Sequence, residues 1–338
     1  MSIKTVTAVA LIAGATAAIV PQIASAQDHV LKVSAPIPPT ERDPVYAWMV
    51  AFEKGVEASS NGQIDVQLFP ANQLGQLPAA VEGVSMGTIE VSFSIIGFFN
   101  ALDPRFQVLD AGGLFNSPEN AMRAYQQPET RQMLSEFGAA AGVKPLVIVI
   151  DGQGVVVSKE PLETVADFEG VKVRTGGAAP LLVDPLIAMG AAPVAMPLGE
   201  VVPGLQTGTI DAATNSMGVV NAFKMADVAK NVTYLPGNYT TVGAVVNTGF
   251  LDKIGPDLAK IVMDEAMKAE SVIFDHLASA PAQEAAWEAA GGQVIRMNDA
   301  EQELFLSISN PIVEGLVAQN PQMQADFEVL KEAAAASQ

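Results

Sequence analysis

Arg174 is the residue whose type and position most clearly suggest chemistry. It ends the short run Val171–Arg174, in which apolar and cationic residues alternate, and Gly176 and Gly177 follow it. Alternation with a period of two predicts a strand, which places Arg174 at the carboxyl end. Ligands of open α/β sheets bind at that end, and a guanidinium offers a carboxylate two parallel charge-assisted hydrogen bonds. The alternative is an arginine that simply reaches solvent from a strand edge.

The residue types that enzymes use most often are scarce. The chain has no cysteine and two histidines, His29 near its N-terminus and His276 inside a predicted helix. Thiol chemistry is excluded, and the clustered histidines, cysteines and carboxylates of a metal site are not found. The sequence also contains no P-loop or GxGxxG pattern. We therefore predict a binding protein with a preformed ligand cleft, no catalytic residues, no cofactor and no metal.

The first 26 residues have the three parts of a secretory signal peptide. Lys4 supplies the positive start, residues 5–20 are apolar or small, and Ala24 to Ala26 form the cleavage signal. No cysteine follows to carry a lipid, and no later apolar run reaches membrane-spanning length. We expect cleavage after Ala26 and a soluble, disulfide-free product in the bacterial periplasm.

The composition limits the classes of partner. The formal net charge is −19, so no basic patch is available to bind nucleic acid or an anionic membrane surface. An anionic ligand would need a local cation to hold it against this general field. About 310 residues remain after cleavage, a length for roughly two domains.

Two stretches of the chain have the same order of strands and helices. Residues 29–94 and residues 155–213 each read as βαβαβ, with Gly87 and Gly208 ending corresponding helices. Such units favour parallel strand pairing with right-handed crossovers. We predict an α/β fold of two lobes resembling periplasmic binding proteins, each lobe a mixed, mostly parallel sheet flanked by helices, with the ligand cleft between them.

The lobe boundaries follow from this interpretation. We assign residues 27–151 and about 240–280 to lobe I, and residues 152–239 and about 281–338 to lobe II. The stretch Pro256–Ala290 is rich in Ala, Met and Glu, and Pro281 interrupts it. It predicts a long, kinked helix that spans both lobes.

Several segments spread over nearly the whole mature chain resemble a known family in their order and spacing. They are Phe69–Gly75, Gly87–Phe93, Asp167–Arg174, Met189–Glu200, Leu205–Asp211 and Asn215. In these segments the chain resembles the substrate-binding proteins of tripartite ATP-independent periplasmic (TRAP) transporters, of the DctP type. The resemblance implies a two-lobed protein that closes on a small organic anion and delivers it to a two-component membrane permease driven by an ion gradient. Most relatives are monomers, which we also expect here.

The same resemblance implies roles for particular residues. The residue matching Arg174 typically forms a salt bridge with the ligand carboxylate, and the one matching Asn215 typically hydrogen-bonds the same end. Gln153 stands where relatives that bind acidic sugars have a second arginine. Leu198 replaces a common aromatic residue, and Ile95 stands where some members have an acid.

These departures, together with Pro36 where some relatives have a polar contact, imply a pocket with one anion anchor and an otherwise neutral or apolar body. That favours a small monocarboxylate, with or without a keto or hydroxy group, or an organic sulfonate, over a dicarboxylate or sialic acid. Gln76, Asn238 and Tyr239 are candidates for further contacts, the alternative being that each is a solvated loop residue. The remaining alternatives for function are a binding protein of an ATP-driven or tricarboxylate-type importer, and a periplasmic enzyme.

Overall fold

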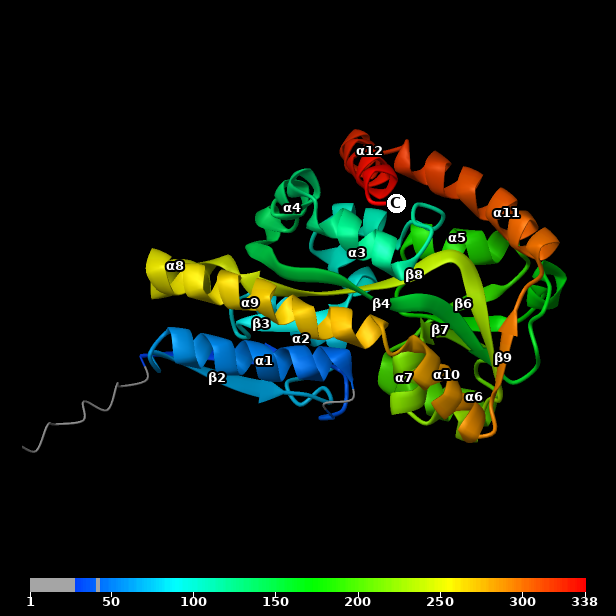
Figure 1. The fold of residues 1–338 in the computed structure, drawn as a ribbon, viewed down its shortest axis with the longest axis horizontal. Helices are drawn as coiled ribbons and strands as arrows, with labels where there is room; N and C mark the ends of the chain where they lie inside the picture. Colours follow the sequence, from blue (N-terminus) through cyan, green and yellow to red (C-terminus); the bar gives the residue numbers. More distant parts are fainter. Residues whose placement is uncertain (1–27, 41–42) are drawn as a thin grey trace, which may run out of the picture.

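Nine strands of the described residues form one mixed sheet that continues through both lobes (Figure 1). The computed structural model describes residues 28–40 and 43–338, so the predicted signal peptide lies outside the described residues. The strands are β1 (His29–Ser34), β2 (Ile64–Phe69), β3 (Val91–Ile95), β4 (Val143–Ser158), β5 (Lys172–Thr175), β6 (Ala192–Ala195), β7 (Ala212–Ser216), β8 (Asn231–Asn247) and β9 (Gln293–Arg296). They lie in the order β2-β1-β3-β8-β4-β7-β5-β6, with β9 also pairing with β8.

Twelve α-helices cover the sheet within the described ranges. They are α1 (Pro44–Ser59), α2 (Leu77–Ser85), α3 (Pro118–Gln126), α4 (Pro128–Leu134), α5 (Pro180–Ala188), α6 (Val201–Thr207), α7 (Met217–Ala222), α8 (Thr248–Ile254), α9 (Pro256–Leu277), α10 (Ala280–Ala289), α11 (Asp299–Val317) and α12 (Pro321–Ala336). Many begin with a proline in the first turn, where the missing N–H costs nothing. No helix in the described ranges is both long and apolar enough to cross a bilayer.

Two long strands carry the chain from one lobe to the other. β4 and β8 pair antiparallel along almost their whole length, and the register shifts on both sides of Gly152 and Gln153. On one side of this point β1, β2 and β3 continue the sheet, and on the other β7, β5 and β6 do so. The lobe boundary predicted from the sequence, between residues 151 and 152, falls inside β4. The structure instead has continuous strands with β-bulges at the junction.

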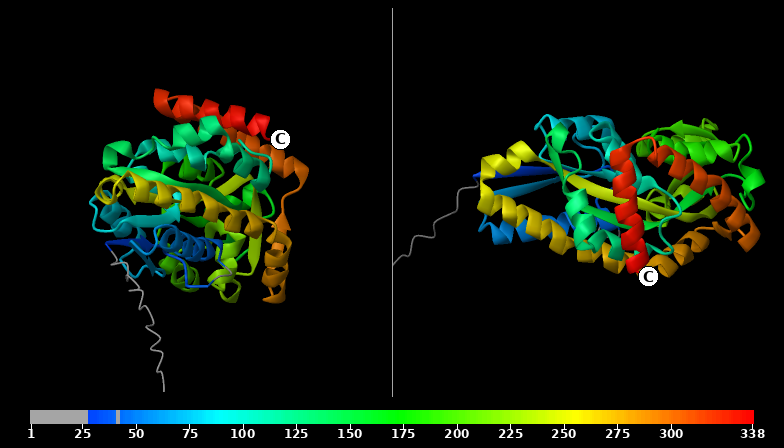
Figure 2. Two further views of the ribbon diagram at one scale, coloured as in Figure 1. Left: turned by 60° about the vertical axis from the view of Figure 1, so that its left-hand side comes forward. Right: turned by 90° about the horizontal axis from the view of Figure 1, so that it is seen from above.

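Each lobe buries its own apolar core. Val33, Trp48 and Phe93 belong to the largest buried cluster, which lies under α1, α3 and α9. In the other lobe, residues such as Trp287 and Phe168 belong to two smaller clusters on opposite faces of the sheet. Figure 2 shows the two lobes side by side, with helices on both faces of each. This is the two-lobed α/β fold predicted from the sequence.

The expected long helix consists of two helices. α9 packs along the first lobe through Val262 and Ile273, and α10 packs on the second through Trp287. The helix ends at Leu277, and Pro281 lies in the first turn of α10. The chain therefore bends just before the proline, where α9 reaches the junction of the lobes (Figure 1).

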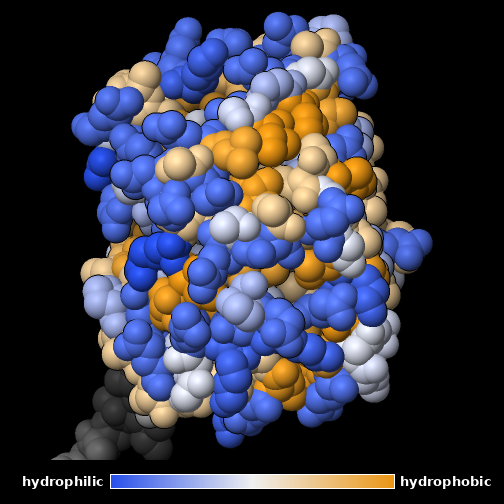
Figure 3. Space-filling model, turned by 90° about the vertical axis from the view of Figure 1, so that its right-hand side faces the viewer, coloured by the Kyte–Doolittle hydropathy of each residue, from blue (hydrophilic) through white to orange (hydrophobic). Residues whose placement is uncertain are grey.

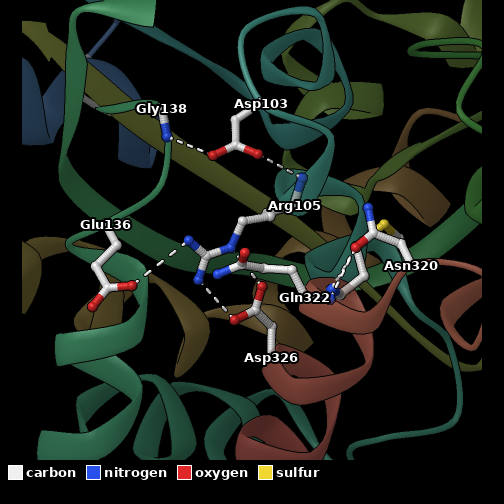
Figure 4. Close-up of polar contacts among 8 residues, drawn as sticks. Asp103, Arg105, Glu136, Gly138, Asn320, Gln322 and Asp326 are labelled. Atoms are coloured by element: carbon white, nitrogen blue, oxygen red, sulfur yellow. Dashed lines mark hydrogen bonds and ion pairs between the residues drawn. The ribbon is translucent and has the colours of Figure 1, made fainter. Parts of the chain in front are cut away.

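The C-terminal helix α12 is fixed to the first lobe by ionic contacts (Figure 4). Arg105 donates from Nε to Asp326 Oδ2 at 2.7 Å and from Nη2 to Oδ1 at 2.8 Å. Its guanidinium carbon lies 4.5 Å from the centroid of the Phe137 ring, and Glu136 Oε2 lies 3.7 Å from its Nη1. Phe327 and Leu330 of α12 join the core of the first lobe. These contacts favour grouping α12 with lobe I, whereas the sequence-based division placed it in lobe II.

The outer end of the second lobe has a mixed surface. Figure 3 shows apolar groups scattered among hydrophilic ones on this face. Ile187 of α5 and Leu304 of α11 are the large hydrophobic residues of these helices that are exposed. Isolated exposed apolar residues of this kind are normal on a protein surface.

Candidate functional site

A cavity lies between the lobes, where the paired strands β4 and β8 pass from one lobe to the other. The first lobe contributes Pro36, Ile37, Asp43, Val45, Leu77, Phe93, Ser94, Ile95, Gly97, Phe98 and Asp110 to its wall. The second lobe contributes Arg174, Gly176, Leu182, Leu198, Thr214, Asn215, Ser216 and Val219. The crossing strands add Asp151 and residues 238–242. Residues of both lobes therefore line the cavity, as is required of the ligand cleft of a protein that closes on its ligand.

Arg174 is the one basic side chain among the described residues that line the cavity. Arg174 is the last but one residue of β5, at the carboxyl end of the strand, and only 2 % of its surface is exposed. Its Nε donates to the Met196 carbonyl at 2.8 Å, and its Nη1 donates to the Thr214 carbonyl at 3.3 Å. No carboxylate of the described residues forms an ion pair with it. Burial lowers the pKa of Arg174 to about 10, so the guanidinium is still charged at neutral pH.

The carbonyl contacts orient Arg174 but leave its charge uncompensated. A buried cation without a counterion is costly, and the usual solution in proteins is a paired anion. The guanidinium has five N–H donors, of which the two contacts above use only part. The remaining donors can bind a carboxylate or sulfonate in the cavity. The alternative of an arginine reaching solvent does not fit a side chain with this burial.

Asn215, on β7, lines the same cavity as Arg174. Its Nδ2 has the sulfur of Met225 at 3.9 Å, a weak acceptor that leaves the amide able to bind a ligand. Leu198 also lines the cavity and belongs to the apolar core of the second lobe. The amide and the leucine give the second lobe one polar and one apolar contact near Arg174.

The lobes touch each other over the cavity through small residues. A Cβ added to Gly177 would lie 3.2 Å from the Gly97 carbonyl oxygen, and one added to Gly176 would lie 1.9 Å from Ile95 Cδ1. Gly97 and Ile95 belong to the first lobe, while Gly176 and Gly177 follow β5 in the second. Glycine therefore permits this close approach of the lobes, with Ile95 forming part of the contact.

Asn238 and Tyr239 lie on β8 and line the cavity rather than projecting from a solvated loop. The ring of Tyr239 packs against Phe115 at 6.3 Å between centroids. Burial, with a smaller contribution from Glu119, raises the pKa of Tyr239 to about 12. Its hydroxyl is therefore neutral at physiological pH and can act as a hydrogen-bond donor.

Gln76 and Gln153 are the two predicted site residues that are not among those lining the cavity. Gln76 caps α2 without a side-chain hydrogen bond and precedes Leu77, which does line it. Gln153 donates from Nε2 to the Leu235 carbonyl at 3.2 Å. It lines a different hollow, together with His276. The bulges around Gly152 change which residues of β4 face the cleft, so simple alternation does not place Gln153.

Three carboxyl groups of the cavity wall were not predicted from the sequence. Asp110 ends the 3-10 helix Pro104–Asp110 and is half-buried, but its Oδ2 atom is buried and has no hydrogen-bond partner among the described residues. Burial alone raises the pKa of its carboxyl to about 7. The only signal for Asp110 in the sequence is that it is an isolated acidic residue within an apolar stretch. The hydroxyl of Ser94 also has no hydrogen-bond partner among the described residues, and no sequence pattern indicates its role.

The other two carboxyls of the cavity wall are Asp43 and Asp151. Asp43 caps α1 by accepting hydrogen bonds from the Val45 and Tyr46 amides. Burial and the nearby charge of Asp151 raise the pKa of Asp43 to about 7. Burial also raises the pKa of Asp151, while a hydrogen bond from Ser216 and the neighbouring His276 oppose the rise. Both groups therefore have partners within the protein.

Within residues 28–40 and 43–338, no group of three His, Asp or Glu side chains is placed to hold a metal ion. The arrangement offers a buried cation, buried carboxyls, an amide and aromatic walls. Such groups bind and orient a small polar molecule.

Comparisons with known proteins agree with this description. Residues 38–320 match the family model of bacterial extracellular solute-binding proteins, family 7, also called DctP. The chain is 29% identical to a 2,3-diketo-L-gulonate-binding periplasmic protein of Escherichia coli, over 64% of this chain and 66% of that protein. It is 27% identical to an ectoine/5-hydroxyectoine-binding periplasmic protein of Ruegeria pomeroyi, over 76% and 73%. It is 29% identical to a C4-dicarboxylate-binding periplasmic protein of Rhodobacter capsulatus, over 66% of each chain.

Solved structures show the same fold. A TRAP periplasmic solute-binding protein of Desulfovibrio salexigens with bound orotic acid has a TM-score of 0.84 at 23% identity, covering 91% of this chain and 99% of that one. A sugar acid binding protein of Advenella mimigardefordensis with galactonate has a TM-score of 0.83 at 20% identity, covering 91% and 98%. With the family model spanning most of the sequence, the chain belongs to the DctP family of TRAP-type solute-binding proteins, which are binding proteins and not enzymes.

Proposed function

We propose that this protein captures a small organic acid with a single anionic group in the periplasm and delivers it to a TRAP membrane permease. The acid is a monocarboxylate, with or without a keto or hydroxy group, or a sulfonate. Arg174 binds the anionic group and Asn215 hydrogen-bonds the same end. The apolar wall around Leu198 and Ile95 contacts the rest of the molecule.

One observation carries this proposal. Arg174 is buried in a cavity between two lobes, is held by backbone carbonyls, and has no carboxylate partner in the described chain. A ligand anion would supply the missing counterion. Because Arg174 belongs to the second lobe and Ser94 and Ile95 to the first, a ligand that contacts both favours the closed arrangement.

The charge inventory of the cavity favours a monoanion over a dianion. Arg174 is its single basic residue within the described parts of the chain, and Asp43, Asp110 and Asp151 lie in the same wall. A second ligand carboxylate would meet no cation and would lie among acidic groups, which costs free energy. Among the relatives, the names cover diketo-gulonate, ectoine and C4-dicarboxylates, so the family tolerates several ligand classes and the charges of this cavity must decide.

Export and delivery rest on the family and on the N-terminal sequence. The signal-peptide pattern of residues 1–26 and the periplasmic relatives support a periplasmic location after cleavage at Ala26. TRAP binding proteins act with a two-component permease, and we expect the monomer to deliver its ligand to one. Genes for two membrane subunits and no ATPase beside this gene would support that partner over an ATP-driven importer.

A thermal-shift screen of residues 27–338 tests the proposal. The panel contains monocarboxylates, keto and hydroxy acids, sulfonates, dicarboxylates, sugar acids and ectoine. A ligand at 100 times its dissociation constant stabilises the folded state by about 2.7 kcal/mol. We expect hits among acids with one anionic group that are lost in Arg174→Ala and kept in Arg296→Ala, whose arginine lies outside the cavity.

The outcomes separate the parts of the proposal. A hit that survives Arg174→Ala would overturn Arg174 as the anchor. Dicarboxylates binding more tightly than monoanions would overturn the substrate class. Conversion of a hit to a product on incubation with the protein would favour the enzyme alternative.

A further inference from the structure

Asp110 is the carboxyl of the cavity wall that has a buried oxygen, Oδ2, without a partner among the described residues. Its Oδ2 is fully buried and accepts no hydrogen bond in the described chain. The residue is on the first lobe, at the end of the 3-10 helix Pro104–Asp110, and lines the same cavity as Arg174. A Cβ added to Gly97, at the contact between the lobes, would lie 3.6 Å from this oxygen.

The other two carboxyls of the wall differ from Asp110. Asp43 Oδ1 accepts two backbone N–H groups of α1, and Asp151 Oδ2 accepts the hydroxyl of Ser216. Each therefore has a structural role that explains its presence. Asp110 has no such role, and buried polar groups without partners in native proteins call for a specific explanation.

The cavity thus presents two unpaired groups of opposite character, one from each lobe. Arg174 offers N–H donors and a positive charge, and Asp110 offers a carboxyl oxygen. They form no ion pair with each other, and burial alone accounts for the altered pKa of each. A simple monocarboxylate would satisfy Arg174 and leave the buried Oδ2 atom of Asp110 unpaired.

We propose that the solute is a zwitterion whose anionic group binds Arg174 and whose cationic nitrogen binds Asp110. This inference rests on the proposed function. Such a molecule gives each buried charge a counterion. It also connects the two lobes through two ionic contacts, so the closed state gains from both ends of the ligand. The hydroxyl of Ser94, which lacks a partner and lines the same cavity, can accept an N–H of the same cationic group.

The protonation behaviour of Asp110 agrees with this role. Its carboxyl has a pKa raised to about 7 in the empty cavity because of burial. A cationic nitrogen beside it would lower that pKa and hold the carboxylate in its ionised form. Asp43, Asp151 and Arg174 are the other charged groups of the wall, and none of them forms an ion pair with Asp110.

Matched pairs of acids, with and without a positive nitrogen, test the inference. The pairs are L-proline with cyclopentanecarboxylate, 4-aminobutanoate with pentanoate, and glycine betaine with 3,3-dimethylbutanoate. Each pair keeps the carboxylate and nearly the same shape. Thermal shift ranks them on the wild-type protein, and calorimetry measures the dissociation constants of the best pair.

We expect at least one zwitterion to bind the wild-type protein about 10-fold or more tightly than its nitrogen-free partner. Asp110→Asn keeps the shape of the side chain and removes the charge. It should weaken the zwitterion by at least about 10-fold and change the nitrogen-free acid by less than about 3-fold. Asp275→Asn, an exposed carboxylate on α9, makes the same change in net charge outside the cavity and should leave both affinities unchanged.

Three results would overturn the inference. They are equal or tighter binding of the nitrogen-free acids, equal weakening of both members of a pair by Asp110→Asn, and a panel in which no zwitterion stabilises the wild-type protein. The comparison on the wild-type protein does not depend on whether the variant folds. If nitrogen-free acids bind and are lost in Arg174→Ala, the proposed function stands while this inference fails. If no acid binds through Arg174, both fail.

Discussion

Replacing Arg174 should separate the contribution of this residue to folding from its contribution to binding. In the ligand-free protein, burial lowers the pKa of Arg174 from 12.5 to about 10. The shift corresponds to a cost on the order of 3 kcal/mol for keeping the charged form folded. Because a depressed basic pKa penalises the charged form, this cost is fully present at every pH below about 10.

Arg174→Met removes the charge and keeps much of the side-chain volume. It regains the burial cost, but it leaves the carbonyls of Met196 and Thr214 without their donor. An unsatisfied buried polar group costs about 1–3 kcal/mol. The two effects largely offset each other, so the free energy of unfolding of the ligand-free variant should stay within about 3 kcal/mol of the wild-type value.

Ligand binding should respond quite differently. An anion enclosed in the cavity of Arg174→Met has no counterion, and breaking a buried charge pair costs about 3–5 kcal/mol. The dissociation constant should therefore rise at least ~100-fold, since 1.4 kcal/mol is a factor of ten. Arg174→Lys keeps the charge but loses the two-pronged donor geometry, and should fall between the two proteins.

Urea unfolding of the ligand-free variants, together with calorimetry using the best hit of the screen, gives both quantities. Arg296→Met is the matched control, because that side chain is 59% exposed and pairs with Glu284 outside the cavity. Affinity of Arg174→Met within about 3-fold of wild type would refute the role of Arg174 as the anion anchor. A loss of more than about 4 kcal/mol of unfolding free energy without ligand would instead show that the carbonyl contacts make Arg174 mainly structural.

Three further predictions concern closure, pH and the C-terminal helix. Gly176→Ala should weaken ligand binding about 10-fold, because its Cβ would lie 1.9 Å from Ile95 Cδ1 across the cleft. The control Gly199→Ala, whose Cβ meets nothing within 4 Å, should leave the affinity unchanged. Equal ligand affinities of Gly176→Ala and the wild-type protein in calorimetry would contradict the close approach of the lobes. Asp110 has a pKa raised from 3.8 to about 7, so the ligand-free protein should lose on the order of 4 kcal/mol of unfolding free energy as pH rises from about 4 to 7. Urea titrations of Asp110→Asn should lack this part of the pH dependence. Parallel plots of unfolding free energy against pH for the variant and the wild-type protein would refute the prediction. Arg105→Ala leaves the buried carboxylate of Asp326 on α12 unpaired. It should cost about 3–5 kcal/mol of unfolding free energy and speed hydrogen exchange in α12. A loss of unfolding free energy below about 1 kcal/mol would contradict the anchoring role of Arg105.

Local signals in the sequence were sufficient for most helices and for the short strands. Proline at helix starts, glycine at helix ends and alternation around Arg174 each depend on neighbouring residues only. The continuity of β4 and β8 depends on pairing between residues about a hundred positions apart. Around Gly152 the sequence resembles a turn, and only the pairing with β8 makes it a bulged strand.

The same difference explains the candidate site. Arg174 was predictable, because strand alternation and the end of a strand place it directly. Gln153 was not, because two register shifts around it change which β4 side chains face the cleft. Asp110 lies in a 3-10 helix after an irregular apolar segment, where no periodicity assigns a direction to a side chain. Its position next to Gly97 at the contact of the lobes depends entirely on tertiary packing.

The burial of unpaired charge also explains how binding and closure are coupled. In a closed, empty cleft, the Arg174 side chain and the Oδ2 atom of Asp110 are removed from water without a counterion, and each residue has a pKa shifted towards its neutral form. Separation of the lobes would rehydrate both groups, so these charges favour opening when no ligand is present. A ligand with complementary charges removes the penalty at both positions and leaves the apolar contacts around Ile95 and Gly176 to favour closure. A ligand that pairs with only one of the two groups leaves part of the penalty in place, so the cleft would discriminate by charge pattern through the equilibrium between open and closed states.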